Sequence, residues 1–234
     1  KIIQRMNMKI TRRDLLSGQF GPNGPGMTIP ELSGQARTII TAGSETTATF
    51  LSGTTYHLLK NPRVYNLLVE EILSAYSTYE DITDTNAWRL KYLSAVMDEG
   101  FRIYPPIGAG IYRERMKKTV EPSTSSWSTC RSPENFHNPD EFKPERWLDP
   151  DCTDKKHASQ PFSLGSRVYI GRNLALKEIR LVLSKMLWVY DMELVNKSLD
   201  LDRDSTSYVL WGKPEIWVRF ARRRGAHVPL LDSE

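Results

Sequence analysis

Residues 161–175, PFSLGSRVYIGRNLA, place particular side chains at a fixed spacing just before a predicted helix. In the pattern F-x-x-G-x-R-x-x-x-G, the loop is framed by Phe162, Gly165, Arg167 and Gly171. Between Arg167 and Gly171 this loop presents the side chain of Tyr169. Tyrosine carries a phenol, whose unperturbed pKa is about 10. The chemistry of the loop therefore depends on whether a phenol can act there.

Three other stretches contain residue types that could take part in chemistry. The stretch AGSETT (42–47) places a glycine and hydroxyl side chains in the middle of a long predicted helix. Glycine in a helix interior costs roughly 1 kcal/mol relative to alanine, so Gly43 indicates a close approach to the backbone. Glu99 and Arg102 form E-x-x-R, and Arg146 lies in PERW (144–147). Alone, E-x-x-R is weak evidence, because i, i+3 charge pairs occur on most helix surfaces.

Helical periodicity dominates the elements that must position these residues. A threonine cap at Thr28 and a proline in the first turn begin the first helix, and Asn61-Pro62 ends it. The periodicity predicts helices over Pro30–Leu59, Arg63–Ser77, Trp88–Tyr104 and Asn173–Tyr190. Between Gly108 and Gln160 the pattern becomes irregular coil, and near the end SYVLWGK and EIWVRF alternate as a short terminal hairpin would.

Composition and charge exclude several classes of protein. A net charge of +4 is a small excess, and the basic clusters at 117–118 and 222–224 have no interleaved aromatic residues, so we expect no nucleic-acid partner. Cys130 and Cys152 give no disulfide framework and suit a reducing compartment. No apolar run approaches the roughly 20 residues of a membrane helix. The chain does not begin with methionine, which leaves open that it is a fragment.

Taken together and in this order, the four motifs resemble the C-terminal half of the haem-thiolate monooxygenases, the cytochrome P-450 superfamily. The phrase RSPENFHNPDEFKPERW is similar to fungal members of secondary-metabolite pathways, the trichothecene-type hydroxylases in particular. The resemblance covers essentially the whole chain. It implies a mainly α fold over a single partial domain, residues 1–234, with a long distal helix, an E-x-x-R helix, a proximal-loop helix and a small terminal β-hairpin.

The resemblance also implies roles for single residues. On the distal helix, small residues leave room for oxygen and polar side chains deliver protons, and the matching positions are Ala42, Gly43, Glu45 and Thr46. Without the motif order, Thr46 and Thr47 would be read as helix-packing hydroxyls. A buried structural charge network matches Glu99, Arg102 and Arg146. The haem loop matches Phe162, Gly165, Arg167 and Gly171, and Arg113 and Arg167 match residues that pair with haem propionates.

One departure from the family falls on Tyr169. The family carries at this position the cysteine whose thiolate binds iron and favours O–O cleavage. A phenol is longer than a thiol, and the loop is shaped for a short side chain. Tyrosinate does ligate haem in catalase-type sites, and Arg167 could help to ionise Tyr169. Cys130 and Cys152 precede the loop and do not replace the ligand. We expect Tyr169 not to be a ligand, and haem to be absent or weakly bound.

A second departure is a gap near residues 114–126. The family has a β-hairpin there that lines the substrate pocket, and about fifteen residues of such a unit are missing from this sequence. The family's N-terminal half, which supplies the other pocket wall and a membrane anchor, has no counterpart in the 234 residues. A half-domain of this kind should expose apolar surface that was meant to be buried.

These features favour a degenerate, truncated and inactive family member from a fungal mycotoxin- or terpenoid-type pathway. One alternative is a retooled, cofactor-free cyclase or isomerase that works by orienting its substrate. Another is a haem-dependent monooxygenase with tyrosine ligation. In the parent family the partners are a small lipophilic substrate and an NADPH-dependent reductase. The family is anchored at the endoplasmic reticulum, whereas this chain as given has no anchor and would be cytoplasmic.

Overall fold

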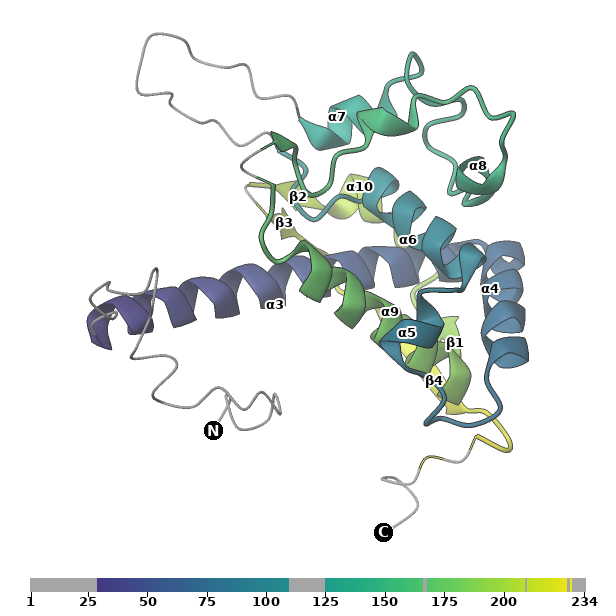
Figure 1. The fold of residues 1–234 in the computed structure, drawn as a ribbon. Helices are drawn as coiled ribbons and strands as arrows, with labels where there is room; N and C mark the ends of the chain where they lie inside the picture. Colours follow the sequence, from purple (N-terminus) through teal and green to yellow (C-terminus); the bar gives the residue numbers. More distant parts are fainter. Residues whose placement is uncertain (1–28, 110–124, 166–167, 209, 227, 229–234) are drawn as a thin grey trace, which may run out of the picture. The chain divides into compact units, whose positions relative to one another are not determined.

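The computed structural model describes residues 29–109, 125–165, 168–208, 210–226 and 228. Within these residues the fold is mainly helical, as the sequence predicts (Figure 1). The chain divides into two compact units, Lys1–Glu45 and Thr46–Glu234, and the boundary falls within the first described helix. The helices and strands are α3 (Ile29–Lys60), α4 (Pro62–Ala75), α5 (Asp84–Ala87), α6 (Lys91–Ile103), α7 (Ser126–Arg131), α8 (Glu145–Leu148), the 3-10 turn η1 (Lys156–Ala158), α9 (Arg172–Val189), β1 (Tyr190–Leu194), α10 (Leu201–Asp204), β2 (Thr206–Ser207), β3 (Trp211–Gly212) and β4 (Val218–Arg222).

The four long helices end close to the predicted residues, for the predicted reasons. Pro62 occupies the first turn of α4, where a proline nitrogen costs no hydrogen bond. The pair Pro105-Pro106 follows α6, which ends at Ile103, because the residue before a proline avoids helical geometry. The third helix differs at its start. Trp88 follows the short helix α5, and α6 begins only at Lys91.

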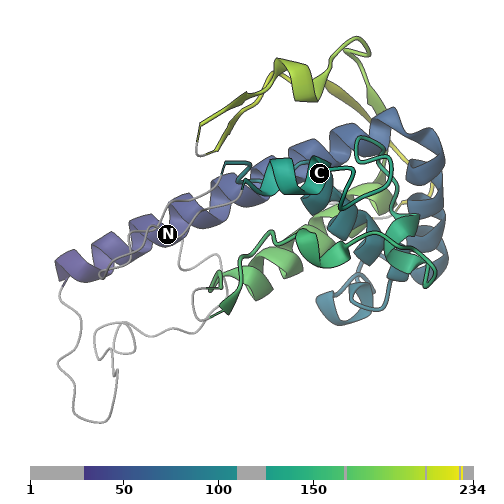
Figure 2. The same ribbon diagram turned by 90° about the horizontal axis from the view of Figure 1, so that it is seen from above.

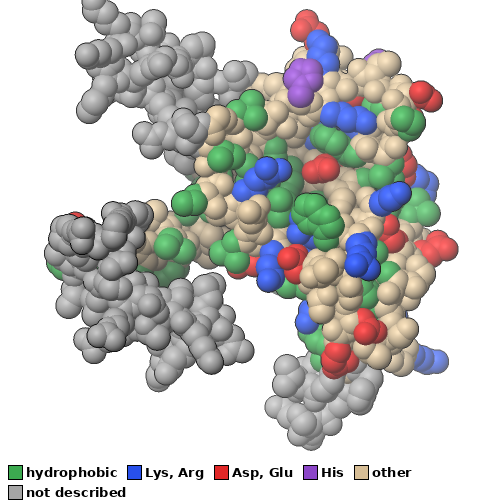
Figure 3. All heavy atoms as spheres, in the orientation of Figure 1, with side chains coloured by type: hydrophobic (Ala, Val, Ile, Leu, Met, Phe, Trp, Pro, Cys, Tyr) green, Lys and Arg blue, Asp and Glu red, His purple; other side chains and the backbone are tan. Residues whose placement is uncertain are grey.

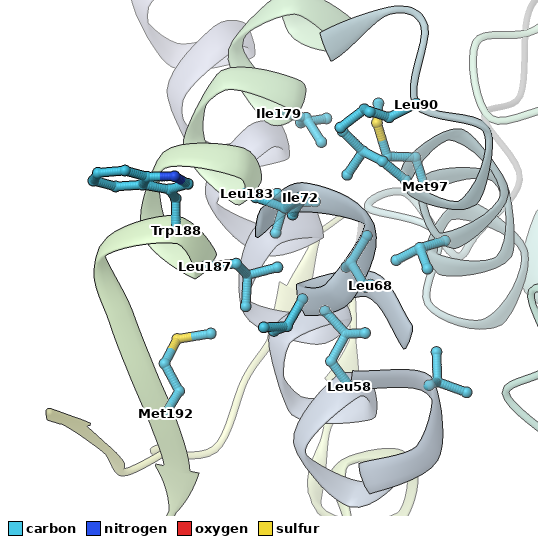
Figure 4. Packing of buried hydrophobic residues seen from close by; sticks show 14 of the residues in the cluster. Leu58, Leu68, Ile72, Leu90, Met97, Ile179, Leu183, Leu187, Trp188 and Met192 are labelled. Atoms are coloured by element: carbon cyan, nitrogen blue, oxygen red, sulfur yellow. The ribbon is translucent and has the colours of Figure 1, made fainter. Parts of the chain in front are cut away.

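Part of the hydrophobic core of the second unit lies between α9 and α4. Ile179, Leu183 and Leu187 recur every four residues on one face of α9, and Leu68 and Ile72 recur in the same way on α4. All five are at most 1% exposed. Figure 4 shows Leu183 beside Ile72 between the two helices. Burial of each such side chain contributes about 1.5–3 kcal/mol, so this seam fixes how the two helices pack.

Two small antiparallel strand pairs complete the described fold. β1 pairs with β4, with Tyr190 opposite Arg222 and Leu194 opposite Val218, and β2 pairs with β3. The alternation in the sequence predicts instead that residues 207–213 pair with residues 215–220. A small antiparallel strand pair is present, as the sequence predicts, but the two alternating stretches do not pair with each other: Ser207 pairs with Trp211, and β4 pairs with the strand that directly follows α9. Alternation identifies a strand and its buried face, but it carries no information about the partner strand.

The irregular segment predicted between Gly108 and Gln160 contains three short helical turns, α7, α8 and η1, in its described part. On another side of the second unit, α10 lies near the C-terminal part of α3: the Leu201 N–H donates to the Tyr56 hydroxyl at 3.3 Å, and this hydroxyl donates to Leu199 O at 2.8 Å. Figure 2 shows α10 and the β2–β3 pair on one side of this part of α3 and α9 on the other.

Candidate functional site

Glu99, Arg102 and Arg146 lie together in a fully buried ion cluster. Glu99 and Arg102 are 0% exposed and Arg146 is 3% exposed. Arg102 donates from Nε to Glu99 Oε2 and from Nη2 to Glu99 Oε1, both at 2.9 Å. Arg146 Nε donates to Glu99 Oε1 at 3.2 Å. Trp147 Nε1 and the backbone N–H of Lys143 donate to the same carboxylate at 2.9 and 2.8 Å. The E-x-x-R helix and the PERW turn therefore meet at one carboxylate.

Arg102 connects this cluster to the irregular segment through backbone carbonyls. Its Nη1 donates to Cys130 O at 3.0 Å and to Pro139 O at 2.7 Å, and its Nη2 donates to Glu141 O at 2.9 Å. The segment has little regular secondary structure that could satisfy these carbonyls. The guanidinium supplies several donors in a rigid fork and therefore fixes the path of the segment.

Asp154 and His137 extend the cluster, and the motifs do not reveal them. Asp154 Oδ2 accepts a short hydrogen bond from Arg146 Nη1. Its Oδ1 accepts from the backbone N–H of His137 at 2.7 Å and lies 2.9 Å from the His137 Nδ1. Burial alone would raise the pKa of the Asp154 carboxyl, but the His137 and Arg146 hydrogen bonds outweigh it and lower the pKa to about 2. The only sequence signal was an acidic residue shortly after PERW, which is too common to be informative.

The candidate haem loop is attached to the core by Phe162. The Phe162 ring lies 5.0 Å from that of Phe101 on α6 in an edge-to-face arrangement. Gly165 has φ +72, a left-handed conformation that glycine adopts without steric cost. The Tyr169 N–H donates to Phe162 O at 2.9 Å and closes the loop, and α9 then begins at Arg172. The two arginines assigned to haem propionates, Arg113 and Arg167, lie outside the described residues.

Tyr169 lies against its own loop. Its ring stacks on Phe162 with centroids 6.3 Å apart and an interplanar angle of 17°. A Cβ added at Gly171 would lie 2.8 Å from Tyr169 Cε1 and 2.9 Å from the hydroxyl oxygen. The phenol edge and its hydroxyl therefore cover the Gly171 backbone. Neither cysteine lies in the loop: Cys130 is buried at α7, and Cys152 lies in the irregular segment.

The oxygen-activation motif lies on α3. Ala42, Gly43 and Glu45 belong to the first unit and Thr46 begins the second, and all four are partly buried. Nothing lies within 4 Å of a Cβ added at Gly43, so the close approach inferred from the sequence is not found among the described residues. The neighbouring hydroxyl of Thr47 is buried and has no hydrogen-bond partner within the described part of the chain.

Two cavities of the second unit are lined mainly by polar residues. One, of about 270 Å³, is lined by residues that include His137, Cys152 and Asp154. The other, of about 510 Å³, is lined by His57, Asn61, Arg63, Asp140, Glu141, Phe142 and Lys143. Of the described residues of the candidate haem loop, 161–165 and 168–171, none lines either cavity.

The described residues contain neither a metal-binding cluster nor a membrane-spanning helix. No group of three or more His, Cys, Asp or Glu side chains in them is arranged to hold a metal ion. Of the helices that the structure describes, none is long and apolar enough to cross a membrane.

Comparison with known proteins identifies the family. The sequence profile described as cytochrome P450 matches residues 7–220, which is most of the chain. The chain belongs to the cytochrome P450 family. The cytochrome P450 monooxygenase ORF9 of Penicillium roqueforti (strain FM164) is 44% identical over 230 residues, covering 94% of this chain and 45% of that protein.

Two further cytochrome P450 relatives match over longer stretches. The monooxygenase astA of Talaromyces wortmannii is 40% identical over 243 residues (97% of this chain, 49% of that protein). Averantin hydroxylase of Dothistroma septosporum (strain NZE10 / CBS 128990) is 37% identical over 241 residues (95% of this chain, 46% of that protein). The chain thus spans slightly less than half of the length of these relatives. Because both matched stretches exceed the 234 residues of the chain, the relatives contain residues within the matched range that this chain lacks.

Proposed function

We propose that this chain is a degenerate cytochrome P450 of fungal secondary metabolism that lacks haem-thiolate monooxygenase activity. The observation that carries the proposal is Tyr169 at the position of the family's ligand cysteine. When bound through a thiolate, haem iron receives the electron density that favours O–O cleavage. The described loop does not fit this centre, because it offers a phenol in place of a thiolate and the phenol lies on Gly171.

The lengths of the matched stretches support the proposed internal gap. Relatives that match over 241 and 243 residues have room for additional residues inside the aligned range. A hairpin missing near residues 114–126 accounts for this difference. We propose that residues 1–234 form a single partial domain, in which one wall of the ancestral substrate pocket is reduced.

The same proposal assigns a role to each of the motif residues. Glu99, Arg102 and Arg146 serve structure, as the full burial and mutual hydrogen bonding of their side chains support. Ala42, Gly43, Glu45 and Thr46 are the inherited counterparts of an oxygen-activating motif. The parent enzyme hydroxylated a small lipophilic molecule and received electrons from an NADPH-dependent reductase. The printed name averantin hydroxylase gives one example of a hydroxylase among the relatives.

Absorbance spectroscopy tests the proposal directly. The purified chain is titrated with haemin, reduced and exposed to carbon monoxide. We expect no red-shifted thiolate band and no stoichiometric Soret change. The positive control joins this chain to the N-terminal half and the hairpin of a relative and carries Tyr169→Cys, and we expect it to recover thiolate-type haem binding. Stoichiometric haem binding by the unmodified chain, together with substrate hydroxylation in the presence of a reductase, would contradict the proposal and favour tyrosine ligation.

The alternative function, a cofactor-free cyclase or isomerase, does not need haem but needs a different kind of site. Such an enzyme needs a pocket that encloses a lipophilic substrate. The two cavities of the second unit are lined largely by charged side chains. A product that co-purifies with the chain, detected by mass spectrometry of an organic extract, would favour this alternative.

A further inference from the structure

Tyr169 makes its ring contacts inside the loop that carries it. The phenol stacks on Phe162 on one side, and its edge covers the backbone of Gly171 on another. Gly171 has φ −79 and ψ 3, a conformation that alanine adopts equally well. Backbone geometry therefore does not require a glycine at 171. The space that an added Cβ would need is occupied by the Tyr169 ring, whose Cε1 would lie 2.8 Å from it.

The same ring is the last member of a series of aromatic contacts that begins in the core. Phe50 on α3 and Phe101 on α6 have centroids 4.0 Å apart and are 1% and 4% exposed. Phe101 contacts Phe162 at 5.0 Å, and Phe162 contacts Tyr169 at 6.3 Å. The guanidinium of Arg172, in the first turn of α9, lies 5.8 Å from the centroid of the Phe162 ring. Aromatic pairs at such separations stabilise beyond the area that they bury.

We infer that Tyr169 is a packing residue that holds the loop closed on Phe162 and Gly171, in place of the bond to iron that the family makes from this position. Phe162, Tyr169 and Gly171 then keep their mutual arrangement without a cofactor. This inference rests on the proposed function, because it explains how the loop persists after the ligand is lost. It also gives Gly171 a specific role in this chain, which is to leave space for the phenol.

Two hydrogen bonds of the loop provide reporters that do not depend on haem. The Tyr169 amide donates to Phe162 O at 2.9 Å, and the Arg172 amide donates to Tyr169 O at 3.2 Å. Both bonds are present in this conformation of the chain around Tyr169. Amide hydrogen exchange by NMR, on the full 234-residue chain purified without haem, measures how often each bond opens.

Substitution of Tyr169 should change the exchange of these two amides. We expect Tyr169→Ala and Tyr169→Cys to accelerate it by about two- to tenfold, which corresponds to the loss of one aromatic pair. Tyr169→Phe keeps the ring and should leave the exchange within twofold of the unmodified chain. Amides of α4 report whether each variant is folded, and Ile170→Ala is the matched control, because Ile170 is 99% exposed.

A double-mutant cycle separates this role from a general loss of stability. Gly171→Ala alone must displace the phenol, so we expect it to accelerate exchange about as much as Tyr169→Ala does. In the Tyr169→Ala background the added methyl meets no ring, and Gly171→Ala should then add little. Strong non-additivity of this kind is the signature of two groups in direct contact.

The result that overturns the inference is unchanged exchange in Tyr169→Ala, or full additivity of the two alanine substitutions. Either outcome leaves the absorbance test of the proposed function untouched, since no haem is present in this experiment. Conversely, haem binding by the unmodified chain would contradict the proposed function without altering the exchange data. The two failures are therefore distinguishable.

Discussion

Glu99 accepts hydrogen bonds from two different stretches of the chain, α6 and residues 143–147. Its two oxygens accept from Arg102, Arg146, Trp147 and the Lys143 backbone. A buried charge is tolerated only when its partners remain in place, because removal of one partner leaves another charge uncompensated in a medium of low polarity. The carboxylate is thus the residue on which the irregular segment most depends.

Glu99→Gln should be severely destabilising. The amide keeps the shape but removes the charge that balances Arg102 and Arg146, so we expect a loss of about 3–5 kcal/mol in the free energy of unfolding. Urea denaturation followed by circular dichroism measures the loss. The control is Glu134→Gln at an exposed position, where we expect a change within about 0.5 kcal/mol. A loss below about 1 kcal/mol for Glu99→Gln would contradict the structural role.

His57 should make the protein sensitive to mild acid. Burial, with smaller contributions from Arg131 and Arg102, lowers the pKa of its imidazole to about 3. The unfolded chain takes up the proton at a pKa of about 6.5, so the contribution of His57 is fully present above pH 6.5 and is lost as the pH falls towards 3. The expected slope is about 1.4 kcal/mol per pH unit.

The measurement compares unfolding free energies of the unmodified chain and His57→Gln between pH 7 and pH 4. Carboxyl groups that titrate in this range act in both proteins, so the difference isolates His57. The control is His157→Gln, which makes the same substitution at an exposed histidine. If His57→Gln shows the same slope as the unmodified chain, the imidazole is protonated in the fold.

At the scale of single residues, the sequence predicted only part of the buried ion cluster. The order of the motifs brought Glu99, Arg102 and Arg146 together as a hypothesis, because each falls inside a recognisable pattern. Asp154 and His137 could not be found in this way. Their positions depend on how an irregular segment folds back on itself, and no periodicity describes such a path.

At the scale of elements, α6 begins with help from a neighbouring helix. Leu90 precedes it and supplies no capping side chain. Instead, the carboxylate of Glu71 on α4 accepts from the backbone N–H groups of Tyr92 and Leu93, both at 2.8 Å. A carboxylate at a helix N-terminus satisfies unpaired donors and complements the helix dipole. One side chain thus sets both the start of α6 and its contact with α4.

Glu71→Ala should therefore cost about 1–2 kcal/mol of unfolding free energy, the usual value of a lost cap. The neighbouring substitution Glu70→Ala provides the control, because Glu70 is exposed on the same helix. Chemical denaturation of the two variants side by side gives the comparison. Equal stabilities would show that solvent replaces the carboxylate at the start of α6 without cost.

The sequence predicted the positions of the helices better than the contacts that the helices and strands make. The 3.6-residue spacing of apolar residues, together with prolines, located α3, α4 and α9 within a few residues. The start of α6 was misplaced by three residues, because its cap comes from Glu71, about twenty residues earlier in the chain. The strand pairing was missed because the partner strand β1 continues directly from α9 and resembles its last turn.

At the scale of the whole molecule, large hydrophobic side chains reach the surface. Ile170 is 99% exposed and Leu164 is 67% exposed in the candidate haem loop, and Trp217 is 60% exposed before β4. Figure 3 shows hydrophobic side chains at the surface among charged ones on one face. Exposed apolar groups that lie close together are typical of surfaces that normally meet a partner or a cofactor.

The purified chain should therefore bind a hydrophobic dye and unfold with weak cooperativity. The double variant Leu164→Ser with Ile170→Ser should lower the dye fluorescence, because it removes two of the exposed groups in the loop. Fluorescence titration and thermal unfolding provide the two measurements. A sharp two-state transition without dye binding would indicate that the chain folds stably by itself. That result would favour the alternative of a cofactor-free cyclase or isomerase.

The position of the ion cluster along the chain has a consequence for synthesis on the ribosome. Glu99 and Arg102 are made first, and their partners at Cys130, Pro139, Glu141 and Arg146 follow over roughly forty residues. At about 5–20 residues per second, the nascent chain carries this pair without its full set of partners for about 2–9 s. During that interval Arg102 lacks the carbonyl groups that it binds in the folded chain, and a transcript that ends before Arg146 yields a chain with an incomplete ion cluster.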